Sequence, residues 1–142
     1  MPTKEEAAQS YLGNAQVKRD GVDIPYTQYQ VEEYARCMAS PTYFAKNYIY
    51  VINLDKGLVR FEPYVYQSIM FDNFQNNNFN IVLACRQSGK SIASVAYLLW
   101  YALFNPEKVV MLLANKHSTA KEMLGRLTLM LENIPFWLQP GC

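Results

Sequence analysis

The second half of the sequence predicts an α/β fold with a mainly parallel sheet. Residues 81–84 form a short, continuous apolar run, as expected for a strand that is covered on both faces. An amphipathic helical pattern follows this run, and residues 109–114 begin a second pair of strand and helix patterns. Strand, loop, helix, strand and helix in this order are typical of the start of a parallel α/β sheet.

The first half predicts a helical and hairpin lead-in to this sheet. Residues 1–22 are polar and weakly patterned, so we expect a loose arm there. Thr27 and Gln30 have the spacing of a capping box, which predicts a helix start, and Pro41 ends that helix. The i, i+3, i+4, i+7 spacing predicts that its apolar face consists of Val31, Tyr34, Ala35 and Met38.

A hairpin and a second helix are expected next. Residues 48–52 are β-branched and aromatic and favour a strand. The turn-forming residues 55–57 then predict a return strand over residues 58–61. Pro63 stands where a helix start tolerates proline, and the asparagine tract at residues 76–78 predicts the end of that helix.

Two further helices complete the expected elements. The first follows residue 91, and its apolar stripe is Ile92, Val95, Ala96, Leu99 and Leu103. The second is predicted to start at the capping box formed by Thr119 and Glu122. Its inward face is expected to be Met123, Leu127, Met130, Leu131 and Ile134.

Composition limits the class of protein. The chain has 142 residues, of which 51% are hydrophobic and 18% charged, a balance typical of one globular domain. A net charge of +1 provides no general attraction to nucleic acid, so any DNA contact must come from local patches. The longest apolar stretch, residues 92–104, is too short to span a bilayer, and the N-terminus has no secretory signal. Three cysteines without CxxC spacing and a single histidine argue against a disulfide framework or a metal centre, and they fit a reducing cytoplasm.

Residues 84–91 read ACRQSGKS and resemble the phosphate-loop pattern GxxxxGK[ST], although Ala84 replaces the first glycine. In such loops the lysine reaches the β- and γ-phosphates and the final hydroxyl binds Mg²⁺. An ordinary strand-to-helix turn is the alternative, but a buried strand before the loop and an amphipathic helix after it favour a nucleotide site. The residues expected to bind ATP are Cys85, Arg86, Gln87, Ser88, Gly89, Lys90 and Ser91, with Ser91 holding Mg²⁺.

Two loop residues have competing interpretations. Arg86 could reach the γ-phosphate and stabilise charge in the transition state. The alternative is a surface arginine paired with an acidic neighbour. Cys85 lies near a helix N-terminus, which can lower the pKa of a thiol, but we favour a small buried filler.

The loop, with its Arg-Gln pair ahead of Gly-Lys-Ser, resembles the deviant Walker A motif of the large terminase subunits of myovirus-type tailed phages. That family does not require the first glycine. Residues 40–48 look like its Pro-x-Tyr-Phe-x-x-Asn-Tyr segment, and residues 56–67 are similar to its Lys-Gly…Phe…Tyr-x-Tyr-Gln stretch. Residues 113–118 look like the segment after its second sheet strand, and residues 136–141 include its Leu-Gln-Pro-Gly. The resemblance covers residues 40–141 in the family's order.

The resemblance implies a RecA/helicase-like P-loop NTPase that uses ATP and Mg²⁺. By it, Gln67 is the adenine-recognising glutamine, Arg86 senses or activates the γ-phosphate, and Lys90 contacts the phosphates. The activity implied is that of a motor that couples ATP hydrolysis to packaging double-stranded DNA into a procapsid. Its expected partners are phage DNA, the portal protein and the small terminase subunit, in an oligomeric ring in the host cytoplasm, with no membrane.

The acids that ATP hydrolysis needs are not evident after the loop. Glu107 falls in a loop, Glu122 in the first turn of a helix, and Glu132 continues a helical stripe rather than ending a strand. We therefore expect an arm and helix over residues 1–39, and over residues 40–142 the first part of an ATPase domain that stops before Walker B. Such a chain would not turn over ATP alone.

Two other functions stay open. One is a helicase-like P-loop ATPase segment, because such proteins also use an upstream glutamine. The other is a non-catalytic remnant that binds another protein through an exposed sheet edge and an aromatic surface made of Tyr43, Phe44, Tyr48 and Tyr50.

Overall fold

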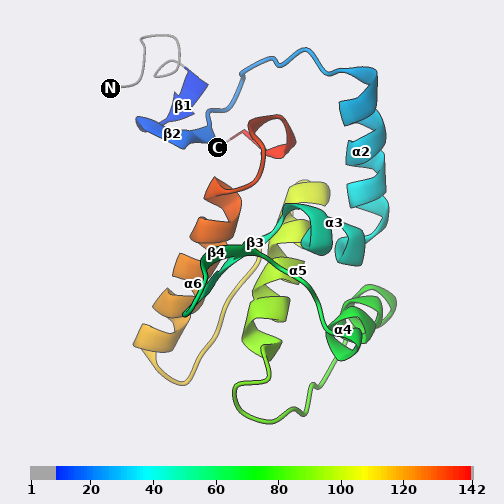
Figure 1. The fold of residues 1–142 in the computed structure, drawn as a ribbon, viewed down its shortest axis with the longest axis vertical. Coiled ribbons are helices and arrows are strands. Elements are labelled where there is room, and N and C mark those ends of the chain that lie inside the picture. Colours follow the sequence, from blue (N-terminus) through cyan, green and yellow to red (C-terminus); the bar gives the residue numbers. More distant parts are fainter. Residues whose placement is uncertain (1–8, 142) are drawn as a thin grey trace.

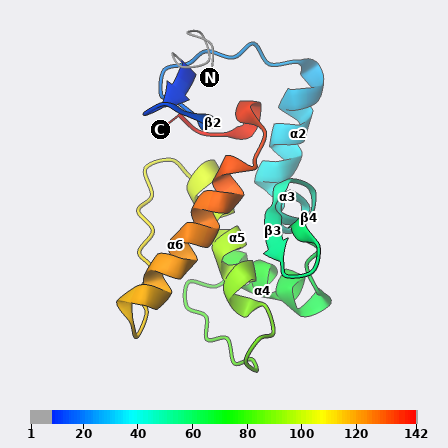
Figure 2. The same ribbon diagram turned by 60° about the vertical axis from the view of Figure 1, so that its left-hand side comes forward.

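The computed structural model describes residues 9–141 and has a mixed α/β architecture in which helices pack around a central helix (Figures 1 and 2). Two separate two-stranded antiparallel sheets, β1–β2 and β3–β4, accompany the helices. The elements in chain order are β1 (Ser10–Tyr11), β2 (Asn14–Lys18), α2 (Gln28–Ala39), α3 (Pro41–Tyr48), β3 (Tyr50–Asn53), β4 (Gly57–Arg60), α4 (Val65–Asn76), α5 (Lys90–Phe104), α6 (His117–Glu132) and the 3-10 helix η1 (Phe136–Leu138).

The predicted capping box at the start of α2 is confirmed. The Gln30 backbone N–H donates to the Thr27 hydroxyl at 3.3 Å, and the Thr27 backbone N–H donates to the Gln30 side-chain oxygen at 2.9 Å. The helix ends at Ala39, as the position of Pro41 predicts. Pro41 also opens α3 as its first residue, where its missing N–H has no helical partner to lose.

The predicted buried face of α2 is wrong. All four residues expected to face inward are exposed: Val31, Tyr34, Ala35 and Met38. The buried residues are Glu33 and Cys37. The carboxylate of Glu33 accepts hydrogen bonds from the hydroxyls of Tyr43 and Tyr48 at 2.8 to 3.0 Å, and the Trp100 indole N–H donates to the Cys37 carbonyl at 2.8 Å. These bonds compensate for the burial of polar groups, so hydrophobic periodicity alone could not identify the face.

The hairpin expected over residues 48–61 is confirmed, but its first strand starts at Tyr50 because Tyr48 ends the helix α3, which was not predicted. β3 pairs with β4 from Tyr50 opposite Arg60 to Asn53 opposite Gly57. The Asn53 side-chain oxygen accepts the backbone N–H groups of residues 55 and 56, and Gly57 takes a φ of +71°, which glycine tolerates.

α5 is the core of the molecule, and its predicted helix is confirmed. It lies between α6 on one side and α3 and α4 on the other (Figure 2). Val95, Ala96 and Leu99 of the predicted stripe are buried. The other buried residues of α5 are Ala93, Tyr97, Trp100 and Phe104, which shows that the helix is covered on more than one face. This packing fixes the start of α5, and the loop before it, against the first turn of α4 and the middle of α6.

Residues 10–18, expected to be a loose arm, instead form the β1–β2 hairpin. The buried side chain of Gln139 holds the hairpin to the end of the chain. Its oxygen accepts the Lys18 backbone N–H at 2.9 Å, and its amide donates to the Gln16 carbonyl at 2.7 Å and to the carbonyls of Leu131 and Ile134. The hairpin depends on a residue more than a hundred positions away, so local patterning gave no signal for it.

The two strands predicted over residues 81–84 and 109–114 are not formed in the part of the chain that the structure describes. Ile81 is 100% exposed, Leu83 99% and Val109 95%. A parallel strand exists only when a neighbouring backbone pairs with it, and no described segment pairs with either run. The parallel sheet is therefore absent from residues 9–141, and the observed sheets are antiparallel.

α6 is helical as predicted, but it starts at His117 with Lys116 as its cap, so the expected capping box at Thr119 is wrong. Glu122 does not reach back to the helix start because it forms an ion pair with Arg126 one turn later. Glu132 lies in the helix, as its pattern predicts, and accepts a hydrogen bond from Asn14.

The aromatic surface expected for a protein-binding remnant is not exposed. Phe44 is fully buried, Tyr43 and Tyr48 are half-buried and bond to Glu33, and Tyr50 is half-buried. Within the described residues, no helix combines the length and the hydropathy needed to cross a membrane.

Candidate phosphate-binding site

The loop between residues 84 and 90 turns sharply because two of its residues adopt left-handed backbone conformations. Gln87 has a φ of +60° and Gly89 a φ of +84°. A β-carbon at position 89 would also lie 2.9 Å from the Gln67 amide nitrogen. The backbone conformation therefore favours glycine at this position, and a larger residue would displace the Gln67 amide, whereas Gln87 carries backbone strain of the kind that concentrates at functional sites.

The loop leads directly into the N-terminus of α5 and borders a hollow of about 300 Å³. No described residue accepts a hydrogen bond from the backbone N–H groups of residues 89–92, at the start of α5. Free N–H groups at a helix N-terminus, together with the helix dipole, make a binding site for an anion. The residues lining the hollow are Gln87, Ser88, Gly89, Lys90, Ser91, Ile92 and Arg126.

Lys90 folds across the base of the loop. Its ammonium donates to the carbonyl of Cys85 at 2.9 Å and approaches the carbonyl of Ala84 at 3.5 Å. The Ser88 hydroxyl donates to the same Cys85 carbonyl at 3.0 Å. No carboxylate among the described residues pairs with Lys90, so its positive charge stays available to an anion in the hollow.

Residues in the first turn of α4 form hydrogen bonds with the loop. The Gln67 amide donates to the Gly89 carbonyl at 3.1 Å, and the Gln67 oxygen accepts the Tyr64 backbone N–H at 2.8 Å. The hydroxyl of Tyr66 donates to the Ser88 carbonyl. Gln67 is buried, so in this conformation its carboxamide positions the loop, and its expected contact with adenine stays a prediction.

Tyr66 is a site residue that sequence reasoning missed. The sequence feature that could have identified Tyr66 is its position next to Gln67 in the Tyr-x-Tyr-Gln stretch.

Cys85 and Arg86 lie on the outside of the loop. Both side chains are exposed and neither lines the hollow. The buried-filler interpretation of Cys85 is therefore wrong, because the run before it is not covered by other strands. Arg86 has no acidic partner among the described residues, and its role at the γ-phosphate stays a prediction.

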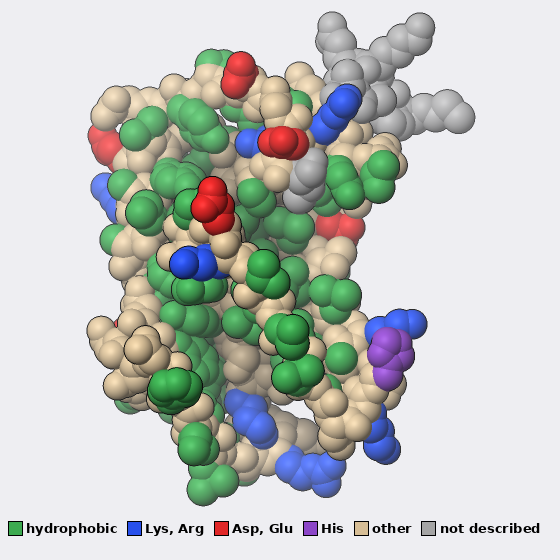
Figure 3. All heavy atoms as spheres, turned by 180° about the vertical axis from the view of Figure 1, so that it is seen from behind, with side chains coloured by type: hydrophobic (Ala, Val, Ile, Leu, Met, Phe, Trp, Pro, Cys, Tyr) green, Lys and Arg blue, Asp and Glu red, His purple; other side chains and the backbone are tan. Residues whose placement is uncertain are grey.

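The charge distribution suits an anion at this end of the molecule. Figure 3 shows Lys and Arg side chains at the lower end of one face of the molecule. The segment between α4 and α5 lies at this end in Figure 1. The acidic side chains visible in Figure 3 lie toward the other end. The described residues contain no group of three His, Cys, Asp or Glu side chains able to hold a metal. Mg²⁺ would fit only in the form it usually takes with nucleotides, held by phosphate oxygens, waters and one hydroxyl, here that of Ser91.

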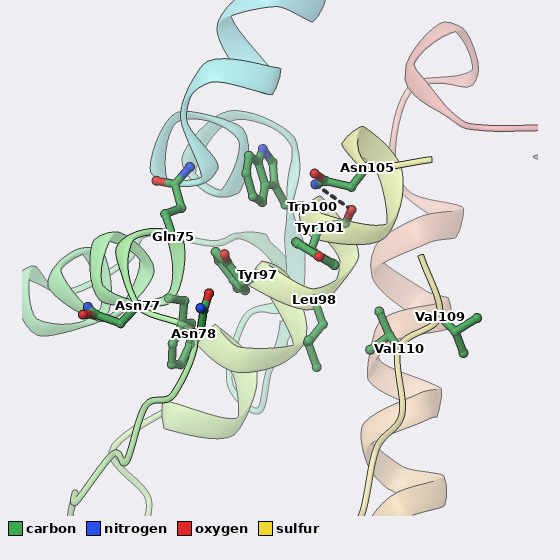
Figure 4. Close-up of a pocket in the computed structure, with 11 residues that line it drawn as sticks. Gln75, Asn77, Asn78, Tyr97, Leu98, Trp100, Tyr101, Asn105, Val109 and Val110 are labelled. Atoms are coloured by element: carbon green, nitrogen blue, oxygen red, sulfur yellow. Dashed lines mark hydrogen bonds between the residues drawn. The ribbon is translucent and has the colours of Figure 1, made fainter. Parts of the chain in front are cut away.

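A larger hollow of about 570 Å³ lies between the end of α4 and α5, away from the loop (Figure 4). Its lining combines the rings of Tyr97, Trp100 and Tyr101 with the amides of Asn77 and Asn78. No charged side chain lines it, so it lacks the chemistry to hold phosphate.

Residues 81–135 match the family model described as the N-terminal part of the terminase large subunit of the T4-like virus type. The matched region contains the whole loop, α5 and α6, which are the parts that build the hollow. Large terminase subunits of this family are generally ATPases of the machinery that packages phage DNA. The resemblance found in the sequence is thus confirmed over residues 81–135, which are similar to the N-terminal region of the T4-like terminase large subunits.

Proposed function

We propose that residues 85–91 bind the phosphates of ATP, and that the chain supplies the ATP-binding segment of a motor that couples ATP hydrolysis to the packaging of double-stranded DNA into a procapsid. The observation that carries this proposal is the left-handed turn at Gly89, after which the N–H groups of residues 89–92 have no acceptor among the described residues and lie beside Lys90. Polyphosphate is the ligand that such a loop recognises.

Each residue has a distinct role in the proposed complex. Lys90 leaves the Cys85 carbonyl for the β- and γ-phosphates, and Ser91 binds Mg²⁺. Arg86, on the exposed side of the loop, stabilises charge at the γ-phosphate during hydrolysis. Gln67, buried here against the loop, turns outward in the complex and offers its carboxamide donor and acceptor to adenine.

The proposal includes a RecA-like, mainly parallel sheet in which residues 81–84 and 109–114 are strands. Both runs expose apolar side chains in this structure, as strands do when the neighbours that should cover them are missing. α5 and α6 also start at the same end of the molecule and run in the same direction (Figure 1), as helices that connect parallel strands do. The pairing strands would come from outside residues 9–141.

The proposed partners follow from the family. They are double-stranded DNA, the portal protein and the small terminase subunit, in an oligomeric ring. Glu132 is in α6 and bonded to Asn14, and Glu107 lies in a loop with a φ of +61°. Neither is placed to orient an attacking water, so we expect nucleotide binding without turnover from the 142-residue chain alone.

Calorimetric titration of the chain with MgATP tests the proposal. Lys90→Ala should weaken binding at least tenfold, because it removes a charge-assisted contact to phosphate worth about 1.5–3 kcal/mol. Lys121→Ala is the matched control, since Lys121 is an exposed lysine that does not line the hollow. Equal affinities of the wild type and Lys90→Ala would remove the phosphate role of the loop.

A further inference from the structure

A second positive side chain reaches the hollow beside the loop from a different helix. Arg126 lies in the middle of α6, and its side chain lines the same hollow as residues 87–91. Lys90 and Arg126 are the two charged residues that line this hollow. Sequence patterning could not identify Arg126, because it is 36 positions beyond Lys90 and meets the loop only through the packing of α5 on α6.

Arg126 lies next to apolar residues and forms one exposed ion pair. Arg126 also lines a neighbouring hollow of about 250 Å³, together with the apolar residues Ile92, Leu129 and Met130. Its guanidinium is paired with Glu122 at 2.5 Å, one helical turn away. The two side chains are 40% and 62% exposed, and an exposed i, i+4 ion pair of this kind is weak.

We propose that Arg126 is a second cationic contact for the polyphosphate, held by Glu122 while the hollow is empty and transferred to phosphate oxygens when nucleotide binds. The inference rests on the proposed ATP site. A guanidinium binds phosphate through two parallel N–H groups, and a triphosphate with its greater charge competes with one carboxylate better than a diphosphate does. Lys90 from α5 and Arg126 from α6 then hold the same ligand, which links the position of α6 to the nucleotide state.

The chain offers a control that separates this role from simple support of α6. Arg126→Gln and Glu122→Gln break the same ion pair, so both variants should lose the same small amount of helix stability. Only Arg126→Gln removes the proposed phosphate contact. Arg126→Lys keeps the charge but not the two-pronged geometry, and Lys121→Gln removes a positive charge from α6 outside the hollow.

The experiment titrates the full 142-residue chain and each variant with MgATP and MgADP, with circular dichroism to confirm helix content. We expect Arg126→Gln to weaken ATP binding about tenfold and ADP binding less, a size typical of one charge-assisted hydrogen bond. Arg126→Lys should restore part of the loss. Glu122→Gln should bind ATP at least as tightly as the wild type, and Lys121→Gln should match it.

Two results separate the possible failures. If Lys90→Ala loses ATP binding but Arg126→Gln stays within twofold of Glu122→Gln, the role of Arg126 is refuted and the proposed function stands. If the wild type binds no ATP at millimolar concentration, or Lys90→Ala binds as well as the wild type, the proposed function fails and this inference fails with it.

Discussion

Replacing Gly89 by alanine should damage both the stability of the chain and its phosphate site. The backbone at Gly89 has a φ of +84°, which costs a non-glycine residue about 1–2 kcal/mol. The new methyl group would also lie 2.9 Å from the Gln67 amide nitrogen, closer than the two atoms can approach. Gln67 must therefore move away from the Gly89 carbonyl, to which it now donates at 3.1 Å.

The two effects together set the expected magnitude. Loss of the hydrogen bond between Gln67 and Gly89 adds about 0.5–1.5 kcal/mol to the conformational cost. We expect Gly89→Ala to lower the free energy of unfolding by about 1.5–3.5 kcal/mol, the sum of those two costs. ATP affinity should fall as well, because the N–H groups that follow the turn lose their common orientation.

Urea unfolding followed by circular dichroism at 222 nm measures this free energy. Gly125→Ala is the matched control, since Gly125 lies inside α6 with no atom within 4 Å of a β-carbon there. That substitution should raise stability by up to about 1 kcal/mol, because alanine favours the helix interior. Gly89→Ala with stability equal to the wild type would show that the turn is not held in its left-handed form.

Three further outcomes follow from the buried groups. The hydrogen bond from Tyr48 lowers the pKa of Glu33 from its ordinary value of 4.5, against the opposing effect of burial. The stability that ionised Glu33 contributes is therefore complete above pH 4.5 and is lost as the pH falls through the lowered pKa. Glu33→Gln should make the free energy of unfolding depend less on pH in urea titrations between neutral and low pH. In a Cys142→Ser background, a thiol reagent at neutral pH should modify the exposed Cys85 and spare Cys37, because burial raises the pKa of the Cys37 thiol to about 12. MgATP should slow the reaction of Cys85. Modification of Cys37 in the folded chain would contradict the packing of α2. Gln139→Leu should cost about 3 kcal/mol in the same urea assay by leaving buried backbone groups without partners, and an unchanged midpoint would show that the β1–β2 hairpin is not held by this side chain.

Elements that depend on neighbours in the chain were predictable. The capping box at Thr27 marked the start of α2, and the turn before Gly57 marked the β3–β4 hairpin, because both are closed by hydrogen bonds within a few residues. The turn over residues 84–90 is also local, and its proposed role in phosphate binding stays a prediction. Its glycine, lysine and serine are adjacent, and the helix that orients them follows at once.

Residues brought together from distant parts of the chain were not predictable. Glu33 is buried only because two tyrosines of α3 donate to it, Gln139 acts on a hairpin at the other end of the chain, and Arg126 reaches the loop only because α6 packs on α5. The runs at 81–84 and 109–114 have strand composition but lack strand structure, since a ladder needs a second backbone. The sequence by itself therefore determined α2, α5 and the hairpin turn, through local hydrogen bonds and the pattern of side-chain types. The tertiary structure decided which faces are buried, which side chains share the hollow, and which apolar runs stay unpaired, because those depend on contacts between segments that no local pattern records.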